Sequence, residues 1–274
     1  MASVWRRPSI ADIYVKQLQT RLDRQLVAVY PPDAPDIRVG TIGRFVKGRF
    51  DRRGHLAELL GGETGFGEAV ALTELSQPTL FSFHSEGTVS LEPAAAVAVA
   101  GKELLKAKLA FTGDRAVVAS FTGVQERSVQ SPRAFDTLLW RLYLDGELGG
   151  DEVVVASHRH AAWGTVLVNR KGGVDLVVSA DPSVVGPALS LGGLAAAGVQ
   201  FGEGSQVSSI VAGPNLTVAL KAKGLSSEET ARIDDVRRFE AAAEERLSAF
   251  EGVDIPSISA TEVVGEADFE TPEE

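Results

Sequence analysis

The sequence predicts an α+β fold: a twisted, mainly antiparallel sheet with flanking helices. Short runs of β-branched residues recur along much of the chain, with Gly, Asn and Pro between them. Three segments instead repeat apolar residues at steps of three and four, as the buried face of a helix does. Strands that follow one another closely favour antiparallel pairing, because a parallel pair needs a long crossover between its strands.

Composition narrows the class of protein. Of the 274 residues, 44% are hydrophobic, which is enough for a sizeable core, and none is cysteine. The lack of cysteine excludes disulfides, thiolate metal sites and a cysteine nucleophile. Residues 5–8 carry two arginines and lead into a helical pattern with regular charges, unlike a secretory signal, so we expect a cytoplasmic protein.

Charge is distributed unevenly along the chain. Residues 1–55 contain eleven basic and five acidic residues, whereas residues 226–274 contain four and fifteen. The basic start and the acidic end can attract each other within the folded molecule, or the basic start can bind an anionic partner when the tail is displaced. The alternative is two solvated surfaces of opposite sign. We therefore divide the chain into a core, residues 1–225, with a basic helix and hairpin at its start, and an acidic, helical and possible regulatory segment, residues 226–274.

The first helix is predicted over residues 9–29, about five turns. Ser9 and Asp12 have the spacing of a capping box, and an apolar stripe follows. The stripe consists of Ile10, Ile13, Tyr14, Leu18, Leu22, Leu26 and Val29. The polar face carries Lys16, Arg21 and Arg24, with Arg6 and Arg7 just upstream. Such a helix can lie on an anionic membrane, although its stripe can equally pack on the sheet.

A short basic hairpin is predicted over residues 37–50, after prolines that end the helical pattern. Its glycines mark turns, and the basic residues of this region form one candidate anion-binding patch. The patch contains Arg44, Lys47, Arg49, Arg52 and Arg53. It lacks the regularly spaced aromatic residues that stack single-stranded bases, and no nucleic-acid-binding motif surrounds it. We therefore expect no nucleic acid partner.

The middle of the chain predicts a connector and strands. Residues 61–67 are rich in glycine but lack both the end of a P-loop and the dinucleotide fingerprint, so we interpret them as a flexible connector. Residues 106–112 and 116–124 are predicted to pair as antiparallel strands across Gly113 and Asp114.

A helix and a meander are predicted next. Ser131 and Pro132 begin the helix as N-cap and first residue, and Gly146 ends it. Three strand-like runs follow within residues 151–179. The glycine-rich residues 169–173 are predicted to reverse the chain as a hairpin turn.

The last third mixes apolar and acidic segments. Residues 182–202 lack charge but contain several glycines, so we predict an apolar loop or buried hairpin and not a membrane-spanning helix. Two strands are predicted at residues 206–211 and 216–222, across residues 213–215. Residues 226–250 form a second amphipathic pattern, with an apolar stripe that includes Ile233, Val236, Phe239 and Leu247.

No set of reacting groups stands out. His158 and His160 would share one face of a strand, as a metal pair requires, but no third ligand lies at a telling distance. No Gly-x-Ser-x-Gly motif occurs in the sequence. We predict no catalytic residue, metal or cofactor.

The order of elements resembles a short gasdermin of the bacterial kind, over roughly residues 9–250. The resemblance lies in a basic amphipathic helix, a basic hairpin, long antiparallel strands, a helix leading into Asp151–Val155, strands ending at residues 216–220, and a detachable C-terminal segment. The chain departs from bacterial gasdermins in lacking a cysteine near its N-terminus for acylation, and no obvious protease motif precedes the tail.

The resemblance implies an autoinhibited pore-forming protein, which a protease activates by removing the C-terminal segment. Its expected partners are anionic membrane lipids, an activating protease and further copies of itself, and it moves from cytoplasm to membrane. The residues expected to bind the membrane are Arg6, Arg7, Arg44, Lys47, Arg49, Arg52 and Arg53, and those expected to hold the tail are Ile233, Val236, Phe239 and Leu247. The alternatives are an interaction protein whose basic face binds an acidic partner, and a small-molecule-binding domain.

Overall fold

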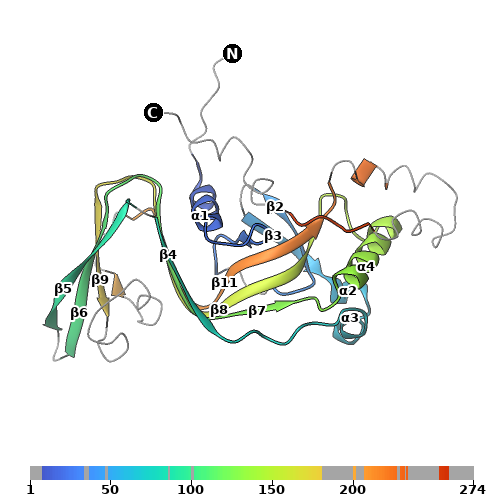
Figure 1. Cartoon of the computed structure of the whole chain (residues 1–274), viewed down its shortest axis with the longest axis horizontal. Helices are drawn as coiled ribbons and strands as arrows, with labels where there is room; N and C mark the ends of the chain where they lie inside the picture. Colours follow the sequence, from blue (N-terminus) through green and yellow to red (C-terminus); the bar gives the residue numbers. More distant parts are fainter. Residues whose placement is uncertain are drawn as a thin grey trace, which may run out of the picture.

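The computed structural model confirms the α+β class. It describes residues 8–33, 37–46, 49–85, 87–99, 102–180, 200–201, 207–226, 229–231, 233 and 253–258. Two sheets and four helices make up this part of the chain (Figure 1). Every strand pairing in it is antiparallel, as the sequence predicts.

The larger sheet forms the body of the molecule. Its strands are β1 (Val27–Ala28), β2 (Thr41–Val46), β3 (Arg49–His55), β4 (Thr79–His84), β7 (Ala116–Ser128), β8 (Val153–Asn169) and β11 (Ser209–Gly224). β8 is central, because it pairs with β7, β11 and β2. β2 and β3 form the predicted basic hairpin, whose tip at residues 47–48 lies outside the described residues.

The first helix, α1 (Ile10–Gln19), begins as predicted but is shorter. The Ser9 hydroxyl accepts a hydrogen bond from the Asp12 N–H at 3.1 Å, and the Asp12 carboxylate accepts one from the Ser9 N–H at 2.6 Å. The prediction of five turns was wrong because the apolar pattern continues through a turn and a strand. Leu22 and Leu26 follow the helix yet pack into the same core.

The glycine-rich connector was also predicted wrongly. After α2 (Leu56–Leu59), most of it forms α3 (Glu63–Ala69). A Cβ at Gly65 would lie 1.7 Å from the Leu60 carbonyl oxygen, so glycine permits a close approach there. Phe66 is the buried residue of α3 and holds the helix against the body.

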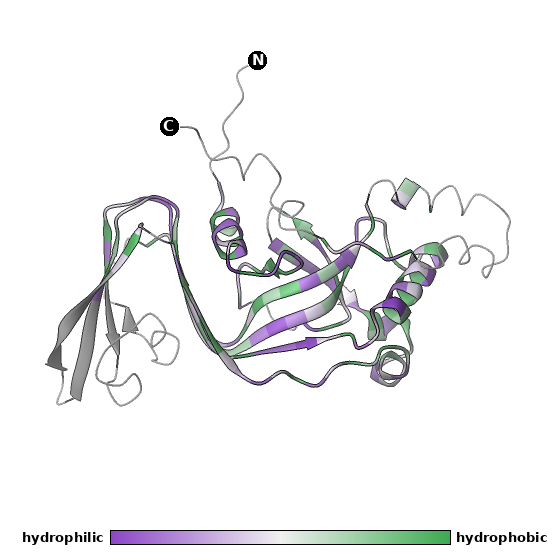
Figure 2. Ribbon diagram, viewed as in Figure 1, coloured by the Kyte–Doolittle hydropathy of each residue, from purple (hydrophilic) through white to green (hydrophobic). Residues whose placement is uncertain are grey.

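The helix α4 (Pro132–Asp145) matches its prediction. Gly146 ends it in the left-handed conformation at φ 80°, which glycine adopts without strain. Figure 2 shows hydrophilic and hydrophobic residues together on both α1 and α4, as expected of helices with one buried face.

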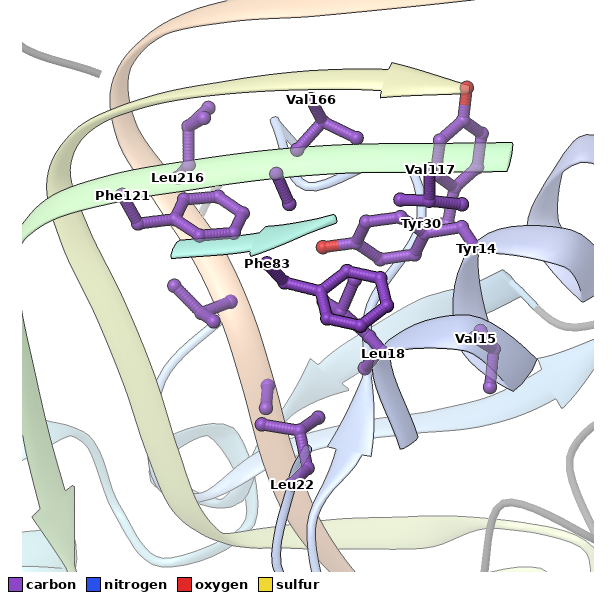
Figure 3. Packing of buried hydrophobic residues seen from close by; sticks show 14 of the residues in the cluster. Tyr14, Val15, Leu18, Leu22, Tyr30, Phe83, Val117, Phe121, Val166 and Leu216 are labelled. Atoms are coloured by element: carbon purple, nitrogen blue, oxygen red, sulfur yellow. The ribbon is translucent and has the colours of Figure 1, made fainter. Parts of the chain in front are cut away.

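Each of these helices organises a core of its own. Tyr14 and Leu18 of α1 pack with Phe83 and Phe121 of the sheet (Figure 3). Trp140 and its neighbours on α4 pack instead with Val154 and Ala156 of β8, and with residues from the C-terminal part of the chain. The body is therefore held by two clusters that share the long strand β8.

The smaller sheet stands apart from the body (Figure 1). Its strands are β5 (Val89–Val99), β6 (Lys102–Phe111), β9 (Val174–Ala180) and β10 (Gln200–Phe201), in the order β10-β9-β6-β5. Three of them connect to a strand of the body through a short bend: β4 leads into β5, β6 into β7, and β8 into β9.

The chain does not reverse its direction at three places where the sequence predicted a turn between paired strands. Residues 169–173 do not form a hairpin turn, because β8 and β9 belong to different sheets. β6 and β7 likewise do not pair with each other across Gly113. Residues 213–215 lie within the single strand β11, where Asn215 takes a positive φ of 55°. Strands predicted as short pieces are thus long ones that cross from one sheet to the other.

Candidate functional site

The bend between the two sheets involves the central strands in unbroken register. The last pair of β7 and β8 before the bend is Ala116 with Asn169. The first pair of β6 and β9 after it is Phe111 with Val174. Residues 112–115 on one strand face residues 170–173 on the other, so four residues separate the pairs on each side. The two strands thus turn the corner together without slipping.

Short polar side chains hold this corner, which we define as the connections β4–β5, β6–β7 and β8–β9 together with residues 207–208, which precede β11. Asp114 accepts a hydrogen bond from the Gly172 N–H at 2.7 Å. Ser208 accepts one from the Arg170 N–H at 3.0 Å and donates to the Asn169 side-chain oxygen at 3.2 Å. These contacts join neighbouring strands where their backbones bend.

Ser85, which directly follows β4, connects that strand to β7 and to α1 by hydrogen bonds. The Ser85 hydroxyl accepts from the Val117 N–H at 3.0 Å and donates to the Gln17 side chain at 3.3 Å. Ser85 and Asn169 are both buried. Polar side chains therefore stabilise the bend, and the hydrogen bond between Ser85 and Gln17 connects it to α1.

The smaller sheet has two different faces close to the corner. Leu109, Phe111 and Leu176 are almost fully buried. Lys108 and Asp175, which are the sequence neighbours of Leu109 and Leu176, form an exposed ion pair at 2.7 Å. Period-two alternation of this kind gives a sheet one apolar and one polar face.

The sheets leave long edges without a strand partner among the described residues. β4 pairs only with β7 and β5 only with β6, and the two residues of β10 pair only with β9. On the far side, β11 is paired with β8 along one edge, while β1 covers its other edge only at Ala219 and Leu220. Unpaired strand edges bind other strands readily.

The basic hairpin is exposed but partly neutralised. Arg44 contacts Asp151 at 3.2 Å, and Arg53 contacts Asp51 at 3.0 Å. Arg49 and Arg52 are exposed on β3. Of the other predicted membrane-binding residues, Arg6, Arg7 and Lys47 lie outside the described residues.

The described C-terminal residues pack against the α4 cluster, and Ile258 also packs against the cluster around α1. Ile233 is 2% exposed and packs in the α4 cluster. The other three residues predicted to hold the tail, Val236, Phe239 and Leu247, lie outside the described residues. So do residues 182–199 and 202 of the predicted apolar loop, whose residues 200–201 form β10.

A second contact, at residues 253–258, was not predicted. We call these residues the docked segment. The Trp140 indole N–H donates to the Val253 carbonyl at 2.8 Å, and Ile255 is 1% exposed within the α4 cluster. The segment also pairs with the end of β11, where the Ile258 N–H donates to the Ala222 carbonyl at 2.9 Å. Alternating apolar residues in an acidic stretch were the available signal.

A buried ion pair lies under the docked segment. The Lys223 ammonium contacts both carboxylate oxygens of Asp136, at 2.6 and 2.7 Å, and the Ile255 carbonyl at 3.1 Å. The side chains are only 8% and 4% exposed. Burial raises the pKa of the Asp136 carboxyl, and the hydrogen bond from Lys223 opposes that shift.

The two histidines of β8 stack with ring centroids 5.5 Å apart. Burial, with a smaller contribution from His160, lowers the pKa of His158 to about 4. His158 is therefore neutral near pH 7. Within the described ranges, no three His, Asp or Glu side chains gather as a metal site would need.

A cavity of about 430 Å³ lies beside His158. Arg38, Arg127 and His55 line it, and Phe66 supplies apolar surface. The His55 ring is fully used, because Nδ1 accepts from the Ala57 N–H at 3.1 Å and Nε2 donates to the Val39 carbonyl at 2.9 Å. Burial lowers the pKa of His55.

Comparison with known proteins adds no assignment. No family model matches the chain, and no curated protein matches it. Among the helices of the described residues, none combines the length and the apolar character needed to cross a bilayer.

Proposed function

We propose that this protein is an autoinhibited, gasdermin-like pore-forming protein that acts on anionic membranes. The observation that supports this most strongly is the smaller sheet. Two hairpins, β5–β6 and β9–β10, leave the body side by side and pair with each other through β6 and β9. Neighbouring strands all run antiparallel, so the outer strands β5 and β10 run in opposite directions.

This arrangement suits head-to-tail assembly of further copies. The β5 edge of one copy can pair antiparallel with the β10 edge of the next, and repetition closes a ring. Closure satisfies the edge hydrogen bonds, which a membrane interior cannot. The apolar face marked by Leu109 and Leu176 would meet lipid, and the face of Lys108 and Asp175 would meet water.

The basic surface would bring the chain to the membrane first. Arg49 and Arg52 are exposed, and Arg44 and Arg53 can exchange their carboxylate partners for lipid phosphates. Arg6, Arg7 and Lys47 add to the same charge. Basic residues near an anionic membrane contribute about 1 kcal/mol each.

The C-terminal segment would restrain this change by holding α4. This helix lies in the connection between β7, which follows β6 of one hairpin, and β8, which precedes β9 of the other. Ile233 and Ile255 fix the C-terminal part of the chain against α4, and the docked segment also pairs with β11. A protease that removes these contacts would free the connection between the hairpins.

Dye release from vesicles tests the proposal. We would compare the full chain with full-length Ile233→Asp and Ile255→Asp variants, and with the exposed change Asp254→Asn as control. Both isoleucine variants should release dye from anionic vesicles, while the unaltered chain and the control should not. Cooperatively folded variants that bind vesicles but release no dye would contradict the proposal.

The cavity beside His158 favours one other function, small-molecule binding. Its volume is within the usual range for ligand pockets. Arg38 is paired with Glu63, which also lines the cavity, so Arg127 is the arginine that would face an anion with an apolar part. Calorimetry with small aromatic carboxylates would test this function. Arg127→Gln should abolish any heat that a genuine site produces.

A further inference from the structure

The docked segment binds in a way that does not require its covalent connection to the rest of the chain. Its polar contacts use backbone carbonyls: Trp140 binds that of Val253, Lys223 that of Ile255, and the Gly224 N–H that of Pro256 at 3.3 Å. Backbone contacts are available to any extended peptide.

Ile255 is the most deeply buried of three apolar side chains that the segment packs on the body, the others being Val253 and Ile258. Ile255 is almost fully buried against α4, whereas Asp254 is exposed. In an extended peptide successive side chains point to opposite sides, so one anchor per two residues is the expected pattern. The groove therefore recognises aliphatic residues, most deeply at position 255 and more shallowly at positions 253 and 258.

The groove is built independently of its occupant. Its walls are α4 and the end of β11, and the Asp136 carboxylate holds the Lys223 ammonium in place from the groove side. β11 is paired with β8 along its whole length, so its free edge is presented by the body sheet. A cavity of about 630 Å³ continues beside the segment, lined partly by Arg133, Lys221 and Asp254.

We propose that the cleft between α4 and the β11 edge is a peptide-binding groove for an extended segment with an aliphatic anchor, which this chain fills with its own residues 253–258. Lys223 is the positioning residue for the anchor's carbonyl, and Trp140 reads the carbonyl two residues earlier. The strand is added to the sheet by edge pairing, as in other grooves that bind extended peptides. This binding does not depend on the proposed membrane activity.

The test uses the full chain with Ile255→Asp, which should empty the groove. Because the Trp140 indole N–H bonds to the segment, its ¹⁵N–¹H resonance reports occupancy. A capped synthetic peptide of residues 253–258 is then added. In the variant the indole resonance should shift, and the peptide should return it to its original position. In the unaltered chain the peptide should have no effect, because the groove is already filled.

Two controls keep the result interpretable. A peptide with Asp at the position of Ile255 should not bind the emptied groove, and the Trp163 indole resonance should stay constant if the body remains folded. If Ile255→Asp does not fold, Ile255→Ala serves in its place. A folded variant whose Trp140 resonance the peptide does not move would overturn the proposal, as would equal binding of the two peptides.

Discussion

Replacing Lys223 by Met should destabilise the protein strongly. All three of the lysine's hydrogen bonds go to buried acceptors, two on Asp136 and one on the Ile255 carbonyl. Methionine has a similar shape but leaves the Asp136 carboxylate buried without a cation. Removing one partner of such a pair lowers the free energy of unfolding by about 3–5 kcal/mol.

The Lys223–Asp136 ion pair itself should contribute far less to the free energy of unfolding than the loss in Lys223→Met suggests. Taking two charges out of water opposes their attraction, so a double variant, Asp136→Leu with Lys223→Met, should recover most of the stability. Urea denaturation of the two single variants and the double variant measures the coupling between the residues. A loss of under about 1 kcal/mol in Lys223→Met, or additive losses in the double variant, would refute the buried pair.

Three further outcomes are expected. Tyr14→Phe should keep or raise the free energy of unfolding, by up to about 1 kcal/mol, because the buried Tyr14 hydroxyl has no partner in the described structure; urea denaturation measures this, and a clear loss would reveal a missed contact. The free energy of unfolding should fall as the pH falls below about 6.5, because His55 has a lowered pKa in the folded protein and therefore binds a proton more readily in the unfolded chain. Melting curves with and without His55→Asn should converge at low pH. Arg49→Glu with Arg52→Glu should weaken binding to anionic vesicles about 30-fold or more, at about 1 kcal/mol for each basic residue.

The vesicle experiment has a matched control on α4, outside the hairpin. Arg133 and Arg141 are exposed on α4, and reversing both changes the net charge by the same amount. This control pair should bind as the unaltered protein does. Binding by the unaltered protein should also weaken with salt, since exposed charges are screened over about 8 Å at physiological ionic strength. Equal losses in the two pairs would show that net charge, and not the hairpin, matters.

Local signals predicted the bounds of α4, because all of them lie within the helix and its caps, although the Ser131 side chain makes no capping hydrogen bond. Ser131, Pro132 and Gly146 mark its ends, and its apolar residues mark its buried face. The capping box of α1 was equally readable. The end of α1 could not be predicted, because Leu22 and Leu26 are buried in the same core although they follow the helix.

The glycine-rich turn signals predicted where the strands are interrupted, but not whether the chain reverses or bends there. Gly113 and the glycines at 172–173 lie at real bends, yet the chain enters a second sheet there and does not reverse. Reversal or bending depends on which strands pair, and those partners lie far away in the sequence. The docked segment is non-local in the same way, since it pairs with β11 about thirty residues earlier.

Lipid contact along β6 tests pore formation most directly. The chain has no cysteine, so Lys108→Cys, Leu109→Cys, Ala110→Cys and Phe111→Cys each give one labelling site. Each variant would also carry Ile255→Asp, receive an environment-sensitive dye, and meet anionic vesicles containing nitroxide lipids. Nitroxides quench only dyes that contact the lipid. We predict quenching at 109 and 111 but not at 108 and 110, whereas vesicle leakage with no quenching, or with equal quenching at all four positions, would contradict a pore built from these strands.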